Sequence, residues 1–89
     1  MSNLKLSIII PAFNEEMVIN KLLTELNESF KDISNYEIII IDDGSDLPLF
    51  ENVESELIKD NLKIIRNNFN IGQTSSIKLG LENSRGEVI

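Results

Sequence analysis

Continuous apolar runs alternate with polar segments along the chain. Residues 6–10 and 37–41 are rich in isoleucine and apolar without alternation, which is typical of strands covered on both faces in a parallel sheet. Weaker runs of the same kind occupy residues 62–65 and 87–89. The pattern therefore predicts four strands.

The segment between the first two runs has the spacing of an amphipathic helix. Six apolar residues share one stripe: Val18, Ile19, Leu22, Leu23, Leu26 and Phe30. Asn14 is a favourable N-cap, and Glu15 and Glu16 would place negative charge in the first turn, where the helix dipole is positive. The sequence thus predicts a helix that begins just after Asn14.

Two further helices are predicted between the later runs. After the second run, Asp46 can cap a helix that has Pro48 in its first turn. The apolar stripe of this helix consists of Phe50, Val53 and Leu57. Residues 74–84 form a third helical segment, in which Ile77 and Leu81 share one face.

The predicted order of elements is β-α-β-α-β-α-β. This order favours an α/β fold with a mainly parallel, Rossmann-like sheet. The chain has 89 residues, of which 42 % are apolar, so it suits one small unit, and no repeat or linker divides it. Ligands of such sheets bind beyond the carboxyl ends of the strands. Functional residues are therefore expected just after Ile10, Ile41 and Ile65.

Charge and composition narrow the classes of function. Fifteen Asp and Glu residues against eight Lys and Arg give a formal net charge of −7, which disfavours nucleic acid as a partner. A nucleotide or sugar phosphate can still bind through backbone N–H groups or a divalent cation. The absence of His and Cys excludes thiol catalysis, Ser-His-Asp triads and zinc sites of the Cys/His type. The apolar run before Pro11 is too short for a signal peptide or a membrane span, so we expect the chain to be cytoplasmic.

Two neighbouring carboxylates follow the second run. Asp42 and Asp43 cannot both be desolvated and ionised without compensation, so we expect one to turn to solvent or a ligand and the other to backbone N–H groups. The alternative is that residues 42–45 form only a turn with a helix cap. Their position at a strand end, beside other polar clusters, favours a ligand site.

The polar clusters after the first and third runs suggest what this ligand could be. Phe13 is either a plug on the end of the sheet or a stacking face for a planar ring. With Asp43 nearby as an acceptor for a ring N–H, a nucleobase fits, and uracil or guanine fits better than adenine. Near Asn70, Gly72 either allows a close backbone approach or is an ordinary loop glycine.

Taken together, these segments resemble the N-terminal part of a family 2 glycosyltransferase with the GT-A fold. The matching pieces are residues 8–16 (IIIPAFNEE), 38–45 (IIIIDDGS), 70–73 (NIGQ), 80–81 (GL) and 84–89 (SRGEVI). Each piece is weak alone, but their order and spacing across the whole chain make the combination specific. Within the family, the chain looks most like the polyprenyl-phosphate sugar transferases, which include the dolichol-phosphate mannose synthases.

The resemblance implies a site for a nucleotide-diphosphate sugar. Its residues would be Pro11, Ala12, Phe13, Asn14, Glu15, Ile41, Asp42, Asp43, Asn70 and Gly72. Asp43 would accept a hydrogen bond from the base, whereas Asp42 would support the loop. The family usually has a small residue between the Ser and the next Asp of this motif, but here Asp46 follows Ser45 directly, which leaves the shape of this loop open.

The resemblance also implies what this sequence lacks. Family members carry an Asp-x-Asp after the fourth strand, which holds Mg²⁺ or Mn²⁺, and a general base further on. The sequence reaches Ile89 before either, so we expect residues 1–89 to be a truncated nucleotide-binding portion with no catalytic or metal-binding residue, inactive by itself. The parent would transfer a sugar from a UDP-sugar, or a GDP-sugar, to a lipid-phosphate or saccharide acceptor. Self-association through the truncated sheet and membrane contact only through downstream segments are further expectations.

Two functional classes other than the transferase are alternative interpretations of the sequence. A receiver-like signalling domain could bind Mg²⁺ through Asp42 and Asp43, but such domains place their acidic pair after the first strand and another Asp after the third. A small, non-enzymatic binding module is the second alternative. A dinucleotide-binding domain is disfavoured, because residues 11–14 (PAFN) stand where Gly-x-Gly-x-x-Gly is needed.

Overall fold

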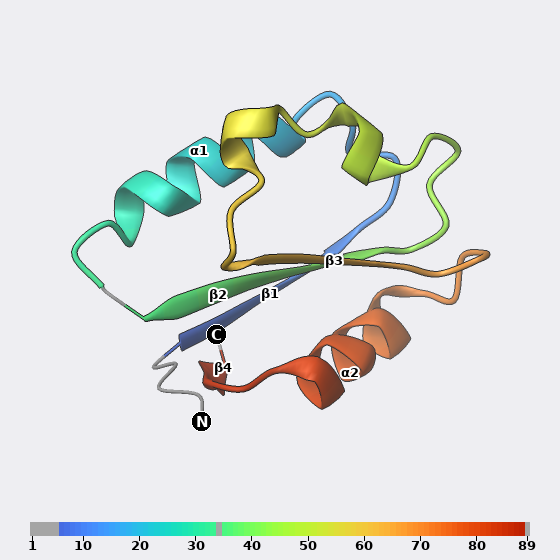
Figure 1. Ribbon diagram of the computed structural model, residues 1–89. Helices are drawn as coiled ribbons and strands as arrows, with labels where there is room; N and C mark the ends of the chain where they lie inside the picture. Colours follow the sequence, from blue (N-terminus) through green and yellow to red (C-terminus); the bar gives the residue numbers. More distant parts are fainter. Residues whose placement is uncertain (1–5, 34, 89) are drawn as a thin grey trace.

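Four parallel strands form a single sheet in the order β3-β2-β1-β4 (Figure 1). The structure, a computed structural model, describes residues 6–33 and 35–88. The strands are β1 (Leu6–Ala12), β2 (Tyr36–Asp42), β3 (Leu62–Arg66) and β4 (Glu87–Val88). The predicted α/β fold with a parallel sheet is therefore confirmed. Of the predicted fourth strand, Ile89 lies outside the described residues.

The isoleucine-rich strand β2 lies inside the sheet and is covered from both sides. Its residues 38–41 are at most 1 % exposed. On one face lie α1 (Ile19–Ser29) and two 3₁₀ turns, η1 (Leu49–Asn52) and η2 (Ser55–Leu57), and on the other lies α2 (Gln73–Asn83) (Figure 1). Because both faces are buried, the strand has no need of the apolar and polar alternation of a half-exposed sheet.

The first helix begins later than predicted. α1 starts at Ile19 with Val18 at its N-cap, and no acidic residue lies in its first turn. Asn14, the predicted cap, instead has a left-handed backbone with φ of 55°. The carbonyl of Glu15 accepts the N–H groups of Val18 and Ile19, so a separate turn precedes the helix. The predicted apolar stripe is confirmed in part: Ile19 and Leu23 are fully buried, and Leu26 and Phe30 pack against the same core, whereas Val18 is 46 % exposed.

The helix predicted after β2 does not form, and the turns η1 and η2 replace it. Asp46 provides no side-chain cap for η1. The break between the two turns is held by Asn20 of α1, whose amide donates to the carbonyl of Asn52 at 2.8 Å and accepts the N–H of Glu54 at 2.7 Å. These two backbone groups are therefore engaged by a side chain rather than by a continuous helix.

Helix α2 forms close to the predicted position but presents an unexpected face to the sheet. Ser76 and Gly80 are buried, whereas Ile77 and Leu81 are 37 % and 47 % exposed. A side chain at position 80 would overlap Ile9 of β1. The small residues thus allow α2 to lie close to the sheet, and the apolar pair that shares one face of the helix stays exposed.

Candidate functional site

Three loops meet at the carboxyl end of the sheet. Ala12, Asp42 and Arg66 are register partners at the ends of β1, β2 and β3. The loops that follow these strands lie together on the right of Figure 1. The strand order also reverses here, because β2 lies on one side of β1 and β4 on the other. The polar clusters therefore converge at the kind of edge where parallel α/β sheets bind ligands.

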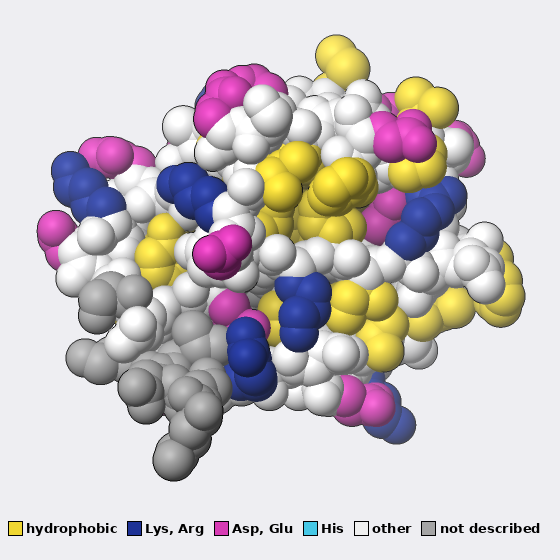
Figure 2. All heavy atoms as spheres, viewed as in Figure 1, with side chains coloured by type: hydrophobic (Ala, Val, Ile, Leu, Met, Phe, Trp, Pro, Cys, Tyr) yellow, Lys and Arg dark blue, Asp and Glu magenta, His cyan; other side chains and the backbone are white. Residues whose placement is uncertain are grey.

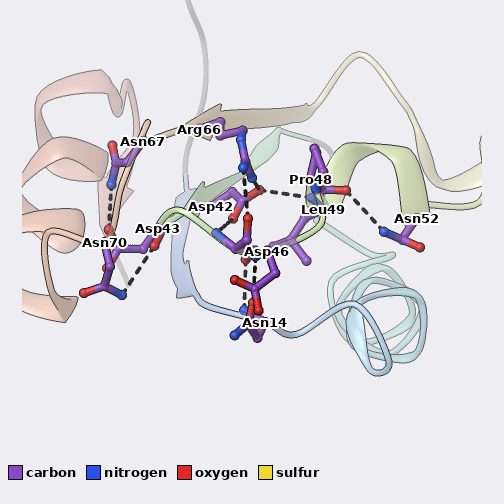
Figure 3. Close-up of polar contacts among 11 residues, drawn as sticks. Asn14, Asp42, Asp43, Asp46, Pro48, Leu49, Asn52, Arg66, Asn67 and Asn70 are labelled. Atoms are coloured by element: carbon purple, nitrogen blue, oxygen red, sulfur yellow. Dashed lines mark hydrogen bonds and ion pairs between the residues drawn. The ribbon is translucent and has the colours of Figure 1, made fainter.

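Asp42 supports the loop that follows β2. Its carboxylate is 1 % exposed and accepts the N–H of Ser45 at 3.1 Å, the N–H of Leu49 at 3.0 Å and the guanidinium of Arg66 at 2.7 Å (Figure 3). Burial raises the pKa of Asp42, but the hydrogen bonds from Leu49, Ser45 and Arg66 outweigh it and hold this pKa below its ordinary value. Asp42 is therefore an ionised anchor inside the protein.

Asn14 ties the loop after β1 to the loop after β2. Its N–H donates to Ser45 Oγ at 2.9 Å, and its Oδ1 accepts the N–H of Asp46 at 2.9 Å (Figure 3). These bonds explain why Asn14 does not cap α1. The sequence left open the shape of the loop after β2, because Asp46 follows Ser45 directly. In the structure both of these residues bind Asn14, and this fixes the loop.

The Asp43 carboxylate is enclosed by the loop that follows β3. Oδ1 accepts the Asn67 amide at 2.9 Å and the N–H of Ile71 at 2.8 Å, while Oδ2 accepts the N–H of Gly72 at 2.9 Å. Burial raises the pKa of Asp43, but the hydrogen bonds from Ile71, Asn67 and Gly72 lower it overall. The prediction that only one of the two carboxylates engages backbone N–H groups is wrong, because both do.

A cleft of about 460 Å³ lies beside these loops. Its lining residues are Pro11, Ala12, Phe13, Glu15, Asp43, Asn70, Gly72 and Gln73. Seven of the ten residues predicted for the site are among them, whereas Asn14, Ile41 and Asp42 are not. Ile41 is buried in the sheet, and the other two hold the loops. Phe13 is 44 % exposed at this cleft, so it does not plug the end of the sheet.

Comparison with known proteins identifies the family. A model described as "Glycosyl transferase family 2" matches residues 7–89. The chain belongs to this family. It is 38 % identical, over 98 % of its length, to a dolichyl-phosphate beta-glucosyltransferase of Dictyostelium discoideum, and 33 % identical, over 93 %, to an undecaprenyl-phosphate 4-deoxy-4-formamido-L-arabinose transferase of Aeromonas hydrophila. A dolichol-phosphate mannosyltransferase of Pyrococcus furiosus is 29 % identical over 96 % of the chain.

This family 2 chain corresponds to a part of those relatives. It spans 29 %, 26 % and 24 % of their respective lengths. In the described residues, no helix is long and apolar enough to cross a bilayer. Figure 2 shows hydrophobic side chains exposed across the middle of this face and at its right-hand edge. Phe69 and Ile71 of the loop after β3 are among the exposed hydrophobic residues.

The acidic pair of this glycosyltransferase chain does not fit a divalent cation. Mg²⁺ needs several oxygen ligands, but both oxygens of Asp42 accept donors, one of them from the Arg66 cation, and of the Asp43 oxygens only Oδ2 accepts a single described bond. Within residues 6–33 and 35–88, no three Asp or Glu side chains gather to hold an ion. This arrangement also removes the basis of the receiver-like alternative, which required Mg²⁺ on this pair.

Gln73 is the lining residue that the predicted site of this family 2 chain omits. It belongs to the recognised NIGQ segment and is the first residue of α2, directly after Gly72. Its position in that motif is a signal that could have included it. Asn67, which contacts Asp43, is a second omission, and a lone asparagine after a strand offers no comparable signal in a single sequence.

The free energy of unfolding of this glycosyltransferase chain is expected to fall when the pH drops below about 4. Folding lowers the pKa of Asp42 and Asp43 from 3.8, so their stabilisation is complete above that value and is lost as the pH falls through the folded-state pKa. Urea unfolding at pH 5 and pH 3 measures the loss. Between these two pH values the Asp43→Asn variant should lose less unfolding free energy than the wild type. The exposed control Asp60→Asn should lose as much as the wild type. Equal losses in Asp43→Asn and the wild type would contradict this account.

Proposed function

We propose that this chain is the nucleotide-binding portion, residues 1–89, of a longer sugar transferase. The observation that carries the proposal is the cleft at the carboxyl end of the sheet, in which an aromatic face, Phe13, lies with an ionised acceptor, Asp43. Its volume of about 460 Å³ lies in the range of small-molecule sites. The donor substrate is a nucleotide-diphosphate sugar whose nucleoside half occupies this cleft.

The charges of the cleft support a role in binding the nucleoside rather than the diphosphate. Among the residues that the structure describes, its lining includes the acidic residues Glu15 and Asp43 and no Lys or Arg. Two carboxylates disfavour a phosphate but can accept the hydrogen bonds of a ring N–H and of ribose hydroxyl groups. Neutralisation of the diphosphate therefore belongs to groups beyond this cleft, and we expect Mg²⁺ or Mn²⁺, held by other residues of the parent enzyme, to supply it.

The ligand chemistry of the cleft favours a base with a ring N–H. Asp43 Oδ2 accepts one described bond, from Gly72, and a carboxylate oxygen can accept a second. Uracil and guanine offer such a donor and adenine does not. We therefore propose UDP as the donor nucleotide, with GDP as the alternative. The names of the relatives support a polyprenyl phosphate as the acceptor.

Several finer expectations from the sequence remain predictions. They are the inactivity of this chain by itself, its cytoplasmic location and its self-association. The exposed side chains of Ile77 and Leu81 on α2 support the last of these, because exposed apolar patches favour association.

Replacing Phe13 by alanine should lower the affinity for UDP about tenfold, since stacking of a base on an aromatic ring contributes roughly 1–3 kcal/mol. Isothermal titration calorimetry of the chain with UDP and GDP measures this effect. Phe50→Ala is the matched control, because Phe50 is an exposed aromatic on η1 that does not line the cleft. Equal UDP affinities for the wild type and Phe13→Ala would refute the proposed pocket, and detectable sugar transfer by the chain alone would refute its inactivity.

A further inference from the structure

The loop between β3 and α2 is organised around one carboxylate. Three donors to Asp43 come from this single segment: the side chain of Asn67 at its start and the N–H groups of Ile71 and Gly72 at its end. The Asn70 amide also donates to the Asp43 carbonyl at 3.4 Å. Asp43 thus closes the segment into a compact turn, and the cleft-lining residues of this loop lie within it.

Asn67 is the member of this arrangement that is itself fixed on several sides. Its N–H donates to the carbonyl of Asp42 at 2.8 Å, which continues the pairing of β3 with β2. Its side-chain amide reaches Asp43 Oδ1 at 2.9 Å and Oγ of the fully buried Ser76 at 3.4 Å (Figure 3 shows Asn67 and Asp43). The amide therefore lies between β2 and α2 and defines where the carboxylate sits.

We propose that Asn67 is a positioning residue for recognition of the donor base. This role rests on the proposed function of the cleft. The Asn67 amide fixes the Asp43 carboxylate through Oδ1 and leaves an acceptor position on Oδ2 for the ring N–H of the base. Asn67 does not line the cleft and acts through Asp43. It therefore contributes to the choice between bases rather than to contact with them.

The test compares nucleotides that differ in the ring N–H. Uracil has a donor at the ring position where cytosine has an acceptor, and guanine and adenine differ in the same way. Calorimetry of the chain with UDP and CDP, and with GDP and ADP, gives two affinity ratios. Each ratio is the affinity for the nucleotide with the ring N–H divided by the affinity for the one without it: UDP over CDP, and GDP over ADP. In Asn67→Ala we expect the ratio of the pair whose N–H nucleotide binds the wild type to fall about tenfold, because a hydrogen bond to a charged acceptor loses its orientation.

Two further variants separate positioning from a general loss of structure. Asn67→Asp keeps the size of the side chain but places a second carboxylate against Asp43, so its ratio should fall at least as far as that of Asn67→Ala. Asn68→Ala is the control, because Asn68 is exposed and makes no side-chain hydrogen bond within the described residues. Its ratio should equal that of the wild type. Amide exchange at Ile71 and Gly72 should accelerate in both Asn67 variants and not in the control.

The outcomes distinguish this inference from the proposed function. If the wild type binds UDP and the ratio in Asn67→Ala stays within twofold of the wild-type value, the inference fails and the proposed function stands. A lower stability of Asn67→Ala with an unchanged ratio would likewise show that Asn67 is merely structural. If the wild type binds none of the four nucleotides, the proposed function fails and takes the inference with it.

Discussion

Replacing Asp42 by alanine is expected to lower the free energy of unfolding by about 3–5 kcal/mol. The carboxylate is almost completely buried and accepts two backbone N–H groups, from Ser45 and Leu49, together with the Arg66 guanidinium. Alanine would leave all of these donors without their acceptor and the Arg66 cation without its charge partner. Because a domain of this kind is typically stable by roughly 5–15 kcal/mol, the variant should be close to unfolding.

Urea unfolding monitored by circular dichroism measures this loss. Asp46→Ala is a suitable control, because Asp46 is exposed and its side chain makes no described hydrogen bond, although its N–H binds Asn14. We expect this control to lie within about 0.5 kcal/mol of the wild type. A loss below about 1 kcal/mol in Asp42→Ala, in a cooperative transition, would contradict the role of Asp42 as the anchor of the loop.

The sheet could be predicted from the sequence because its signal is local. The runs of isoleucine at residues 6–10 and 37–41 need only both faces covered to form buried parallel strands, and each run lies within an observed strand. β1 continues to Ala12 because the register with β2 extends to Asp42, a pairing between distant segments. α2 was likewise predicted to within one residue at each end.

The misplaced elements depend on side chains that bind backbone groups far away in the sequence. Asn14 is of a residue type that favours helix N-caps, but its hydrogen bonds go to Ser45 and Asp46. The segment after β2 has a helical stripe, but Asn20 of α1 holds it open. In the first case the preference of Asn14 for a cap position is overridden, and in the second the helical preference of the segment after β2; in both, the overriding partner lies more than thirty residues away in the sequence.

The candidate site follows the same division. Pro11, Phe13 and Asp43 could be placed at one edge from the strand ends alone, because parallel strands end on the same side of a sheet. The network around the carboxylate could not, since it depends on how residues 67–72 turn back toward β2. Single-sequence reasoning finds which loops meet but not which atoms of those loops bind each other.

The glycine after the acidic pair has the second large expected effect. Gly44→Ala should cost about 3–5 kcal/mol of unfolding free energy, since a left-handed backbone strains alanine and overpacking adds a similar amount. Gly44 has φ of 75°, and a Cβ there would lie 2.6 Å from the carbonyl carbon of Phe69 and 2.7 Å from the nitrogen of Asn70. These neighbours are backbone atoms, so no side chain can rotate aside.

The comparison with Gly72→Ala separates strain from contact. Gly72 also has a positive φ, of 96°, but a Cβ there would meet nothing within 4 Å. Its alanine variant should therefore lose only about 1–2 kcal/mol in the same urea titration. Equal losses at the two positions would mean that the close approach of residues 69–70 to Gly44 is unimportant.

The same contact bears on the binding of UDP. A Cβ at position 44 moves the loop of residues 69–70 away from β2 and weakens the hydrogen bonds to Asp43. The UDP affinity of Gly44→Ala should therefore fall at least tenfold, even at temperatures where the variant remains folded.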